Sequence, residues 1–210
     1  KVLPSELKQL QGACDLLIGA DGVNSIVRKQ YAAKFVTHEH KAKIRFTWFY
    51  NDSPKLQTDV RFYAIKTPSG VIQLSSYPLT DTRQAVIIEM TEECYQSGGF
   101  HQQSTAEATP YLNKIFTSNE DKIALISTNL PWFSFKMNTV ENLFYRNVAL
   151  IGDAAFSFHY SAGVGLQTAF NMGYALTKCF EHCDDINTIL NHYSKMTPIA
   201  LGASIDKSLD

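Results

Sequence analysis

The sequence has little that would suit a nucleic-acid-binding, membrane-spanning or secreted protein. Its 19 Lys and Arg nearly balance 20 Asp and Glu, for a formal net charge of -1, and no basic block occurs. Electrostatic capture of nucleic acid or of an anionic membrane is therefore not expected. No apolar run approaches the roughly 20 residues that span a bilayer, and the sequence shows no signal peptide.

Cysteine is scarce too, with four in 210 residues. Cys179 and Cys183 lie four residues apart on one face of a predicted helix, with His182 between them. Because no second ligand pair follows, we predict no metal site. We expect reduced structural thiols in a cytoplasmic protein.

What the sequence does have is a globular composition and two changes of local pattern. Hydrophobic residues make up 45% and charged residues 19% of the chain, which suits a buried core in one large domain or two small ones. Residues 1–36 and 146–210 have the pattern of buried strands followed by helices, whereas residues 37–145 alternate as strands do. We predict an α/β (α+β) fold, in which an antiparallel sheet is inserted into an incomplete three-layer α/β domain that ends in C-terminal helices.

In the two outer segments, each strand candidate precedes a helix candidate. Residues 14–20 form an apolar run that ends at an Asp-Gly turn, after which Asn24 or Ser25 can cap a helix that extends to Tyr31. In the last segment a strand, a loop and two helices follow one another. Their predicted ranges are 147–153 for the strand, and 166–183 and 186–196 for the helices, the second of which ends before Pro198.

The middle segment has short turns between alternating runs, which predicts an antiparallel meander. The strand candidates are residues 44–50, 60–66, 71–77, 84–90 and parts of 123–145. A helix is predicted over residues 104–116, where Ser104 and Glu107 fit a capping box, although Pro110 can move its start to Thr109.

An aspartate beside a glycine stands at the end of each buried strand candidate, at Asp21 and at Asp153. In open α/β sheets ligands bind beyond the carboxyl ends of the strands. An Asp there can accept hydrogen bonds from sugar or ribityl hydroxyls, and the adjacent Gly lets the backbone approach the ligand. A Gly-x-Gly turn at residues 163–165 then begins a helix, whose N-terminus carries partial positive charge. Each motif alone is also a common structural turn, but their order around a β-rich insert is specific.

Together these motifs resemble the flavoprotein monooxygenases typified by para-hydroxybenzoate hydroxylase. Residues 21–28 match every fixed position of that family's DG motif, and residues 152–155 match its GD motif. The resemblance covers nearly the whole chain. It implies that residues 1–36 and 146–210 belong to an FAD-binding domain and residues 37–145 to a substrate-binding domain. It also implies that Asp153 binds the ribityl chain and that residues 163–165 lie at the pyrimidine edge of the flavin. We expect Arg28 to bind a cofactor phosphate, with the capping of local carboxylates as the alternative. The residues so assigned to the cofactor are Asp21, Gly22, Ser25, Arg28, Gly152, Asp153, Ala154, Gly163, Val164 and Gly165.

The implied activity is the hydroxylation of a small aromatic substrate. In the family, NAD(P)H reduces FAD, and the reduced flavin reacts with dioxygen to give a flavin hydroperoxide that hydroxylates an activated ring. Short pieces at residues 46–50, 77–78, 87–93 and 159–161 resemble the subgroup that acts on aminobenzoyl-CoA, salicylyl-CoA and tryptophan-derived indoles. His159 is the candidate acid or base, with a structural role as the alternative. The candidate walls of the substrate pocket, each of which also suits ordinary sheet core, are Phe46, Trp48, Phe62, Tyr77 and Trp132.

The sequence departs from the family pattern at several positions. Phe156 replaces a usual His, Tyr160 a usual Pro and Gln167 a common Asn. The Gly-x-Gly-x-x-Gly turn that cradles the cofactor pyrophosphate is absent, since Thr168 stands where a third Gly would be needed. Because the sequence also begins with Lys1 rather than Met, we expect a fragment whose sheet lacks central strands and exposes apolar edges.

Two other functional classes stay open. One is a non-catalytic remnant that binds a partner through its open sheet edge. The other is a flavin protein of different chemistry, such as a reductase, an oxidase or a halogenase, although the paired tryptophans of halogenases are absent. None of these motifs specifies an oligomeric state.

Overall fold

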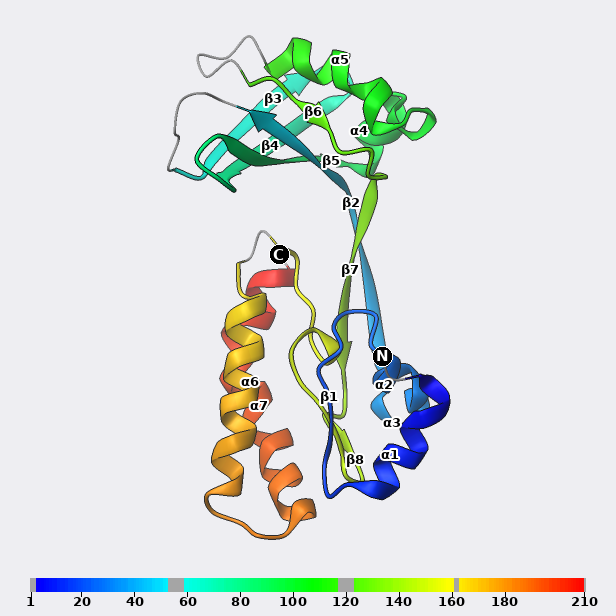
Figure 1. The fold of residues 1–210 in the computed structure, drawn as a ribbon, viewed down its shortest axis with the longest axis vertical. Coiled ribbons are helices and arrows are strands. Elements are labelled where there is room, and N and C mark those ends of the chain that lie inside the picture. The colour runs from blue at the N-terminus through cyan, green and yellow to red at the C-terminus, as the bar shows by residue number, and fades with distance from the viewer. Residues whose placement is uncertain (1–2, 53–58, 117–122, 161–162, 210) are drawn as a thin grey trace. The chain divides into compact units, whose positions relative to one another are not determined.

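The chain forms two compact units in a computed structural model that describes residues 3–52, 59–116, 123–160 and 163–209. Unit 1 comprises Lys1–Ala42 and Lys136–Asp210, and unit 2 comprises Lys43–Phe135 (Figure 1). The sequence pattern places the divisions after residues 36 and 145, because it detects a change of period rather than the packing that defines each unit.

Unit 1 is built from short helices, a three-stranded sheet and two long C-terminal helices. Its elements are η1 (Pro4–Glu6), α1 (Leu7–Ala13), β1 (Leu17–Gly19), α2 (Ile26–Gln30), α3 (Ala32–Phe35), β8 (Phe144–Tyr145), β9 (Val148–Leu150), η3 (Gly152–Ala154), α6 (Gly165–Phe180) and α7 (Ile186–Leu209). Unit 2 contains β3 (Arg61–Thr67), β4 (Gly70–Pro78), β5 (Arg83–Thr91), α4 (Glu92–Ser97), η2 (Phe100–Gln102), α5 (Thr105–Phe116) and β6 (Ile126–Ser127). The two remaining strands, β2 (Thr37–Asp52) and β7 (Phe133–Val140), run through the unit boundaries.

The sheet of unit 1 has the order β1-β9-β8. β1 runs parallel to β9, with Leu17 opposite Val148, whereas β8 is antiparallel to β9. All three residues of β9 are fully buried, as an uninterrupted apolar run predicts for a strand that is covered on both faces. Because β1 and β9 are parallel, their carboxyl ends, which precede Asp21 and Asp153, lie at one edge of the sheet.

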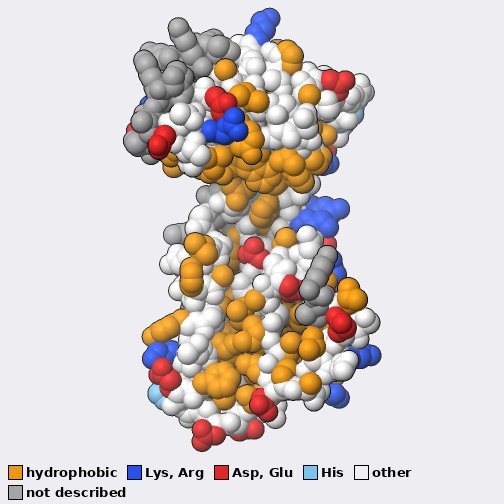
Figure 2. All heavy atoms as spheres, in the orientation of Figure 1, with side chains coloured by type: hydrophobic (Ala, Val, Ile, Leu, Met, Phe, Trp, Pro, Cys, Tyr) orange, Lys and Arg blue, Asp and Glu red, His pale blue; other side chains and the backbone are white. Residues whose placement is uncertain are grey.

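β1 is shorter than the predicted strand, because Cys14 still belongs to the end of α1. It is also an edge strand, and its central residue Ile18 is 44% exposed. An exposed apolar edge is what the sequence predicts. Figure 2 shows hydrophobic side chains gathered on the viewed face of unit 1.

The two C-terminal helices supply most of the core beside this sheet. α6 buries Met172 and Leu176, and α7 buries Tyr193, whose hydroxyl donates a 2.8 Å hydrogen bond to the carbonyl of Leu150 at the end of β9. The prediction that the second helix ends before Pro198 is wrong, since α7 continues to Leu209. A proline in a helix removes one backbone donor and crowds the preceding turn, and here the helix continues despite this cost.

The sheet of unit 2 has the order β3-β4-β5-β2-β6. The three strands β3, β4 and β5 form the predicted antiparallel meander. β2 pairs with β5 rather than with the strand that follows it in sequence, so the meander does not extend to the first strand. One face of this sheet packs against α5 in a core that contains Phe49, Ile72, Leu74, Ile88 and Leu112.

α5 begins at Thr105, so the alternative start at Thr109 is wrong. The predicted capping box is confirmed: the Ser104 Oγ accepts from the Glu107 N–H at 3.2 Å, and a Glu107 carboxylate oxygen accepts from the Ser104 N–H at 2.7 Å. Pro110 lies inside the helix. The capping box and the buried face of the helix, which includes Leu112, offset the loss of one backbone hydrogen bond.

Candidate functional site

A pocket lies in unit 1 where the two parallel strands end. Its volume is about 390 Å³. Residues that follow β1, residues that follow β9 and the first turn of α6 line it, and they are Ala20, Gly22, Ile151, Gly152, Asp153, Gly165, Leu166 and Ala169. The parallel pairing of β1 with β9 thus brings four predicted cofactor-binding residues together, namely Gly22, Gly152, Asp153 and Gly165.

Two glycines of this pocket have backbone conformations that other residues rarely adopt. Gly152 has a φ of 59°, and a Cβ atom built on it would lie 3.2 Å from the Cβ of Ala169 on α6. Gly22 has a φ of 80°, with open space where its Cβ would be. Glycine at Gly152 therefore lets the turn after β9 pack closely against α6, whereas at Gly22 it permits the left-handed turn after β1.

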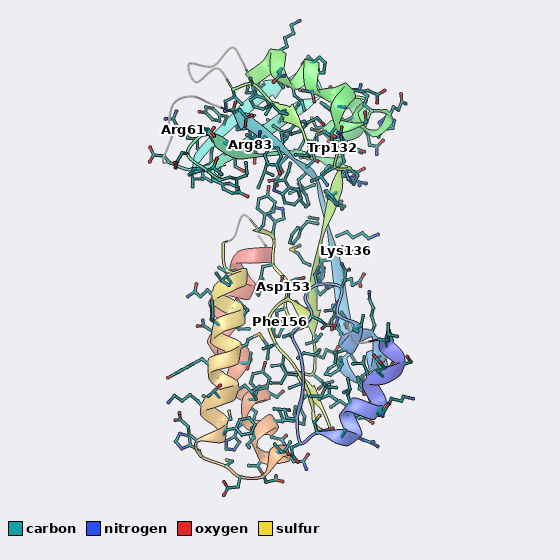
Figure 3. All side chains as sticks on the ribbon, in the orientation of Figure 1. Arg61, Arg83, Trp132, Lys136, Asp153 and Phe156 are labelled. Carbon is teal, nitrogen blue, oxygen red and sulfur yellow. The ribbon has the colours of Figure 1, made fainter. Side chains whose placement is uncertain are left out.

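Asp153 stands in the η3 turn directly after β9 and lines the pocket (Figure 3). Its side chain is exposed, but desolvation by the surrounding protein raises the pKa of its carboxyl above the ordinary value. The Oδ1 atom of Asp153 lies 3.9 Å from the point where a Cβ atom of Gly165 would be. The carboxyl is thus an acceptor directed at the same region as the first turn of α6.

The first turn of α6 presents backbone N–H groups that have no hydrogen-bond partner among the residues that the structure describes. Val164 occupies the N-cap position without a side-chain hydrogen bond, and the first bond within the helix runs from Thr168 N–H to the Val164 carbonyl at 2.8 Å. The preceding N–H groups therefore have no partner within the helix. Gly163, with a φ of 66°, turns the chain into this end. The arrangement suits an electron-rich or anionic group.

Asp21 and Ser25 cap α2. Asp21 Oδ2 accepts from the N–H groups of Ile26, at 2.6 Å, and Val27, at 3.3 Å. Ser25 is buried, and its Oγ accepts from the Arg28 N–H at 2.9 Å, which confirms it rather than Asn24 as the N-cap residue. Both side chains therefore shape the turn that places Gly22 in the pocket.

Arg28 connects the two motifs. Its side chain is only 3% exposed, and its guanidinium donates to the carbonyls of Ala154 at 2.5 Å and Val23 at 2.6 Å, with a longer contact of 3.5 Å to the carbonyl of Asp153. Desolvation by burial lowers its pKa, against the opposing effect of Glu39 and Asp21. The guanidinium thus fastens the turn after β9 to the turn after β1.

A second connection between these turns was not predicted from the sequence. Asn138 on β7 is 1% exposed, and its Nδ2 donates to the Val23 carbonyl at 3.0 Å. Its backbone N–H donates to Ser157 Oγ at 2.8 Å, and its carbonyl accepts from the Ser157 N–H at 2.9 Å. The only signal in the sequence is a polar residue within a strand pattern, which does not reveal its partner.

The segment after the pocket explains one departure from the family pattern. Phe156, which replaces a usual His, is 5% exposed and belongs to the core of unit 1 together with Phe158. His159 is half-buried, and its ring lies 4.7 Å from the ring of Tyr160. The role of His159 as an acid or base stays a prediction. Residue 161, the last of the segment 159–161 that resembles the family subgroup, lies outside the described residues.

The sheet of unit 2 brings together four of the five predicted substrate-pocket residues. Cross-strand partners share a sheet face, and the register aligns Trp48 with Ile87, Ile87 with Ser75, and Ser75 with Phe62. Phe46 lies two residues from Trp48 and Tyr77 two residues from Ser75, so both share the sheet face of Trp48 and Phe62. This face is opposite the one that packs against α5. Figure 2 shows hydrophobic side chains gathered on the face of unit 2 that α5 leaves uncovered.

Further aromatic side chains join this face from β7. The ring centroids of Phe46 and Trp48 are 5.1 Å apart, and that of Phe133 lies 5.8 Å from each. Phe62 is 78% exposed. The fifth predicted residue, Trp132, is in a different cluster, with Tyr95 and Phe100.

Comparison with known proteins identifies the family to which this chain belongs. A family model described as "FAD binding domain" matches residues 6–194. The chain belongs to the FAD binding domain family. This confirms the resemblance that the DG and GD motifs indicate.

Two curated relatives of this chain are named as a hydroxylase and a monooxygenase. Salicyloyl-CoA 5-hydroxylase from Streptomyces sp is 26% identical over 183 residues, which cover 83% of this chain and 34% of the relative. The 3-hydroxy-4-methyl-anthranilyl-[aryl-carrier protein] 5-monooxygenase of Streptosporangium sibiricum is 27% identical over 165 residues, which cover 79% of this chain and 43% of the relative. The chain therefore spans less than half the length of either.

Solved structures share the fold. The tetrameric form of 2-methyl-3-hydroxypyridine-5-carboxylic acid oxygenase matches with a TM-score of 0.69 and 15% identity, over 93% of this chain and 55% of that chain. The predicted α+β fold is confirmed. Within the described ranges, no helix combines the length and apolarity needed to cross a membrane, and no group of three or more His, Cys, Asp or Glu is placed to hold a metal ion.

Proposed function

We propose that this chain is part of an FAD-dependent monooxygenase that hydroxylates an aromatic substrate, with dioxygen as oxidant and NAD(P)H as electron source. The observation that carries the proposal is the pocket where two parallel strand ends, the Gly152-Asp153 turn and the N-terminus of α6 meet. The names of the curated relatives support the reaction class. The cytoplasmic location stays a prediction.

The residues of the pocket fit one part of FAD. The Asp153 carboxylate, which lines the pocket, would accept a hydrogen bond from a ribityl hydroxyl, and Gly152 would let the backbone approach the ligand closely. The backbone N–H groups in the first turn of α6 would suit the electron-rich edge of the flavin ring. Bound FAD would supply the redox chemistry, while these residues bind and orient it.

The aromatic face of unit 2 would hold the substrate ring. Phe46, Trp48, Phe62 and Tyr77 present an apolar surface on one side of the sheet, and such surfaces both bind aromatic rings and exclude water. His159 would move a proton at a substituent of the substrate. Each of these roles is part of the proposal.

A flavin titration of the 210-residue chain tests the cofactor part. We expect riboflavin, FMN and FAD all to bind, because the pocket is proposed to recognise the ribityl chain and ring that they share. Flavin fluorescence and absorbance would report binding. Asp153→Ala should weaken it by about tenfold, the effect of losing one charge-assisted hydrogen bond, whereas Asp184→Ala, at an exposed position before α7, should not. A folded chain that binds none of the three flavins would refute the proposal.

Turnover then separates the reaction classes. With FAD and NAD(P)H present, an aromatic thioester panel should stimulate NAD(P)H oxidation and yield a product that contains an oxygen atom from labelled dioxygen. Oxidation without labelled product would instead identify a reductase or oxidase.

A partner-binding role is the second candidate, and one observation favours it. Leu166, Phe170 and Tyr174 recur every fourth residue along α6 and are 72%, 70% and 65% exposed. Light scattering of the parent chain and of a variant with all three replaced by Ser would test it. Self-association that the triple variant abolishes would support this role, and a monomeric parent chain would count against self-association.

A further inference from the structure

A second pocket of unit 1 lies at the other end of β9 from the pocket at Asp153. Its volume is about 530 Å³, and α1, the segment from α2 to α3 and the turn between β8 and β9 form its walls. That turn precedes β9, whereas Asp153 follows it, and the two pockets share no lining residue. The polar and aromatic residues of the wall include Lys8, Gln11, Tyr31, Lys34, Tyr145 and Arg146.

Positive charge dominates this second pocket. Lys8, Lys34 and Arg146 line it, and none of its described lining residues is Asp or Glu. None of the three cations forms an ion pair with a carboxylate in the part of the chain that the structure describes. Glu6, two residues before Lys8, accepts a hydrogen bond from the Leu3 N–H at 2.7 Å. Because the chain as a whole has a formal net charge of -1, the positive charge here is a local feature.

Two of these cations lie against the same aromatic ring. Lys34 Nζ is 5.5 Å from the centroid of the Tyr145 ring, and Arg146 Cζ is 5.4 Å from the same centroid. Each contact between a cation and the ring is favourable, but two positive charges held against one ring repel each other. An anion bound beside the ring would be attracted to both cations and would offset their repulsion.

The aromatic part of the wall is held by its neighbours. Tyr31 is buried, and its ring centroid lies 5.9 Å from that of Tyr145. Its hydroxyl donates to Gln11 Oε1 at 2.8 Å, which leaves the amide N–H groups of Gln11 as donors for a ligand. α3, which carries Lys34 in its last turn, packs beside β8 (Figure 1). The rings that contact the cations are therefore in place before a ligand binds.

Arg146 has a backbone conformation that favours glycine. It is the first residue of the turn at 146–147 and has a φ of 54°. A non-glycine residue in this region costs about 1 kcal/mol or more, and such strain concentrates at sites where a side chain has a role. Glycine would relieve the strain but would remove the guanidinium. The arginine at this position therefore indicates that its side chain contributes something beyond the turn itself.

We propose that this pocket binds a phosphate group of a small, soluble phosphate ester. The planar guanidinium of Arg146 matches two phosphate oxygens, and the ammonium groups of Lys8 and Lys34 add point charges beside it. A lipid surface or a polyanionic polymer is instead recognised by cations spread over a face, whereas these three line one cavity. The inference goes beyond the proposed monooxygenase reaction, because it adds an anion site at the opposite end of β9, and it does not depend on flavin binding.

Calorimetric titration of the 210-residue chain with pyrophosphate tests the site. At low ionic strength we expect saturable binding with a Kd on the order of 0.1–1 mM, which weakens as salt is added because the three cations are exposed. Acetate, with one charge, should bind at least about tenfold more weakly. Absence of saturable pyrophosphate binding, or equal binding of acetate, would overturn the inference.

Two further arms locate the ligand and its source. Excess riboflavin, which carries no phosphate and would occupy the pocket at Asp153, should leave pyrophosphate binding unchanged, and competition between the two would overturn the inference. Vesicles of phosphatidylcholine and phosphatidic acid should not sediment with the chain. Sedimentation with these vesicles would identify a lipid headgroup rather than a soluble ester and would also overturn it.

Single variants assign the binding to these residues. Arg146→Gly should weaken pyrophosphate binding about 3- to 10-fold with little change in Tm, because relief of the positive φ offsets the entropic cost of glycine. Lys34→Gln should weaken binding by a similar factor. Lys195→Gln, at an exposed position on α7, removes the same charge elsewhere and should bind as the parent does. Circular dichroism would show that each variant is folded. Arg146→Gly and Lys34→Gln variants that bind as tightly as Lys195→Gln would refute the assignment.

Discussion

Replacement of Arg28 by Met should destabilise unit 1 and weaken flavin binding together. Met preserves much of the length and the apolar stem of the buried side chain but removes its donors. The Ala154 carbonyl, which is buried, would lose the guanidinium that contacts it at 2.5 Å. The Val23 carbonyl would keep one partner, because Asn138 Nδ2 also donates to it at 3.0 Å.

The magnitude follows from these two unequal losses. A buried acceptor left without a partner costs about 1–3 kcal/mol, and the loss of a charged hydrogen bond to Val23 adds about 1 kcal/mol. Relief of the desolvation that lowers the pKa of Arg28 offsets part of this cost. We therefore expect the free energy of unfolding to fall by about 2–3 kcal/mol, which corresponds to roughly 5–10 °C in Tm for a chain of this size.

Urea unfolding followed by circular dichroism measures this change, with an unchanged m-value as evidence that the denatured state is unaffected. Lys29→Met, at the exposed neighbouring position on α2, is the matched control and should stay within about 0.5 kcal/mol of the parent. A double variant with Asn138→Ala should lose more than the sum of the single variants, because only then is the Val23 carbonyl without both donors. An Arg28→Met variant as stable as the Lys29→Met control would refute the assignment of Arg28 as the connection between the two turns.

Four other substitutions test the same unit. Gly152→Ala should lower the free energy of unfolding by about 1–3 kcal/mol because of its positive φ and close packing, whereas Gly173→Ala, in the interior of α6 with open space around the new methyl group, should raise it by about 0.5–1 kcal/mol; urea titrations that give both the same sign would contradict this. Asp153→Asn should leave the free energy of unfolding at pH 7 unchanged or slightly higher, because burial raises the pKa of this carboxyl and so disfavours its charged form. The difference in free energy between variant and parent should vanish in acid below the unfolded-state pKa, where the carboxyl of the parent is protonated in both the folded and the unfolded state. A stabilisation by Asn that grows as the pH falls would contradict the raised pKa. Tyr193→Phe should lower stability by about 1–2 kcal/mol, since it leaves the buried Leu150 carbonyl without that donor, and a calorimetric Tm equal to that of the parent would argue against it.

The features that sequence predicts well here are those set by local geometry. The capping box at Ser104 and Glu107 and the alternation that places Phe46 and Trp48 on one sheet face both follow from fixed periods. The shared edge for Asp21 and Asp153 follows from parallel pairing of two apolar runs. In each case the relevant partners are either close in sequence or constrained by a regular element.

The features that sequence misses depend on contacts between distant segments. The partner of Asn138 is the carbonyl of Val23, 115 residues away, and a backbone carbonyl leaves no trace in the sequence. Trp132 separates from Trp48 because the loop before it is anchored to β2 through the Pro131 carbonyl. Pro198 gives the signal of a helix end, yet tertiary context keeps α7 helical beyond it.

The two boundaries between the compact units have a practical consequence for protein engineering. Residues 42 and 135 both lie within strands, inside β2 and β7. A chimaera joined at these points would have to splice extended backbone in register, because a one-residue offset turns every following side chain to the opposite side. Exchange of unit 2 between members of this family therefore calls for junctions chosen by strand alignment, with an even number of residues gained or lost.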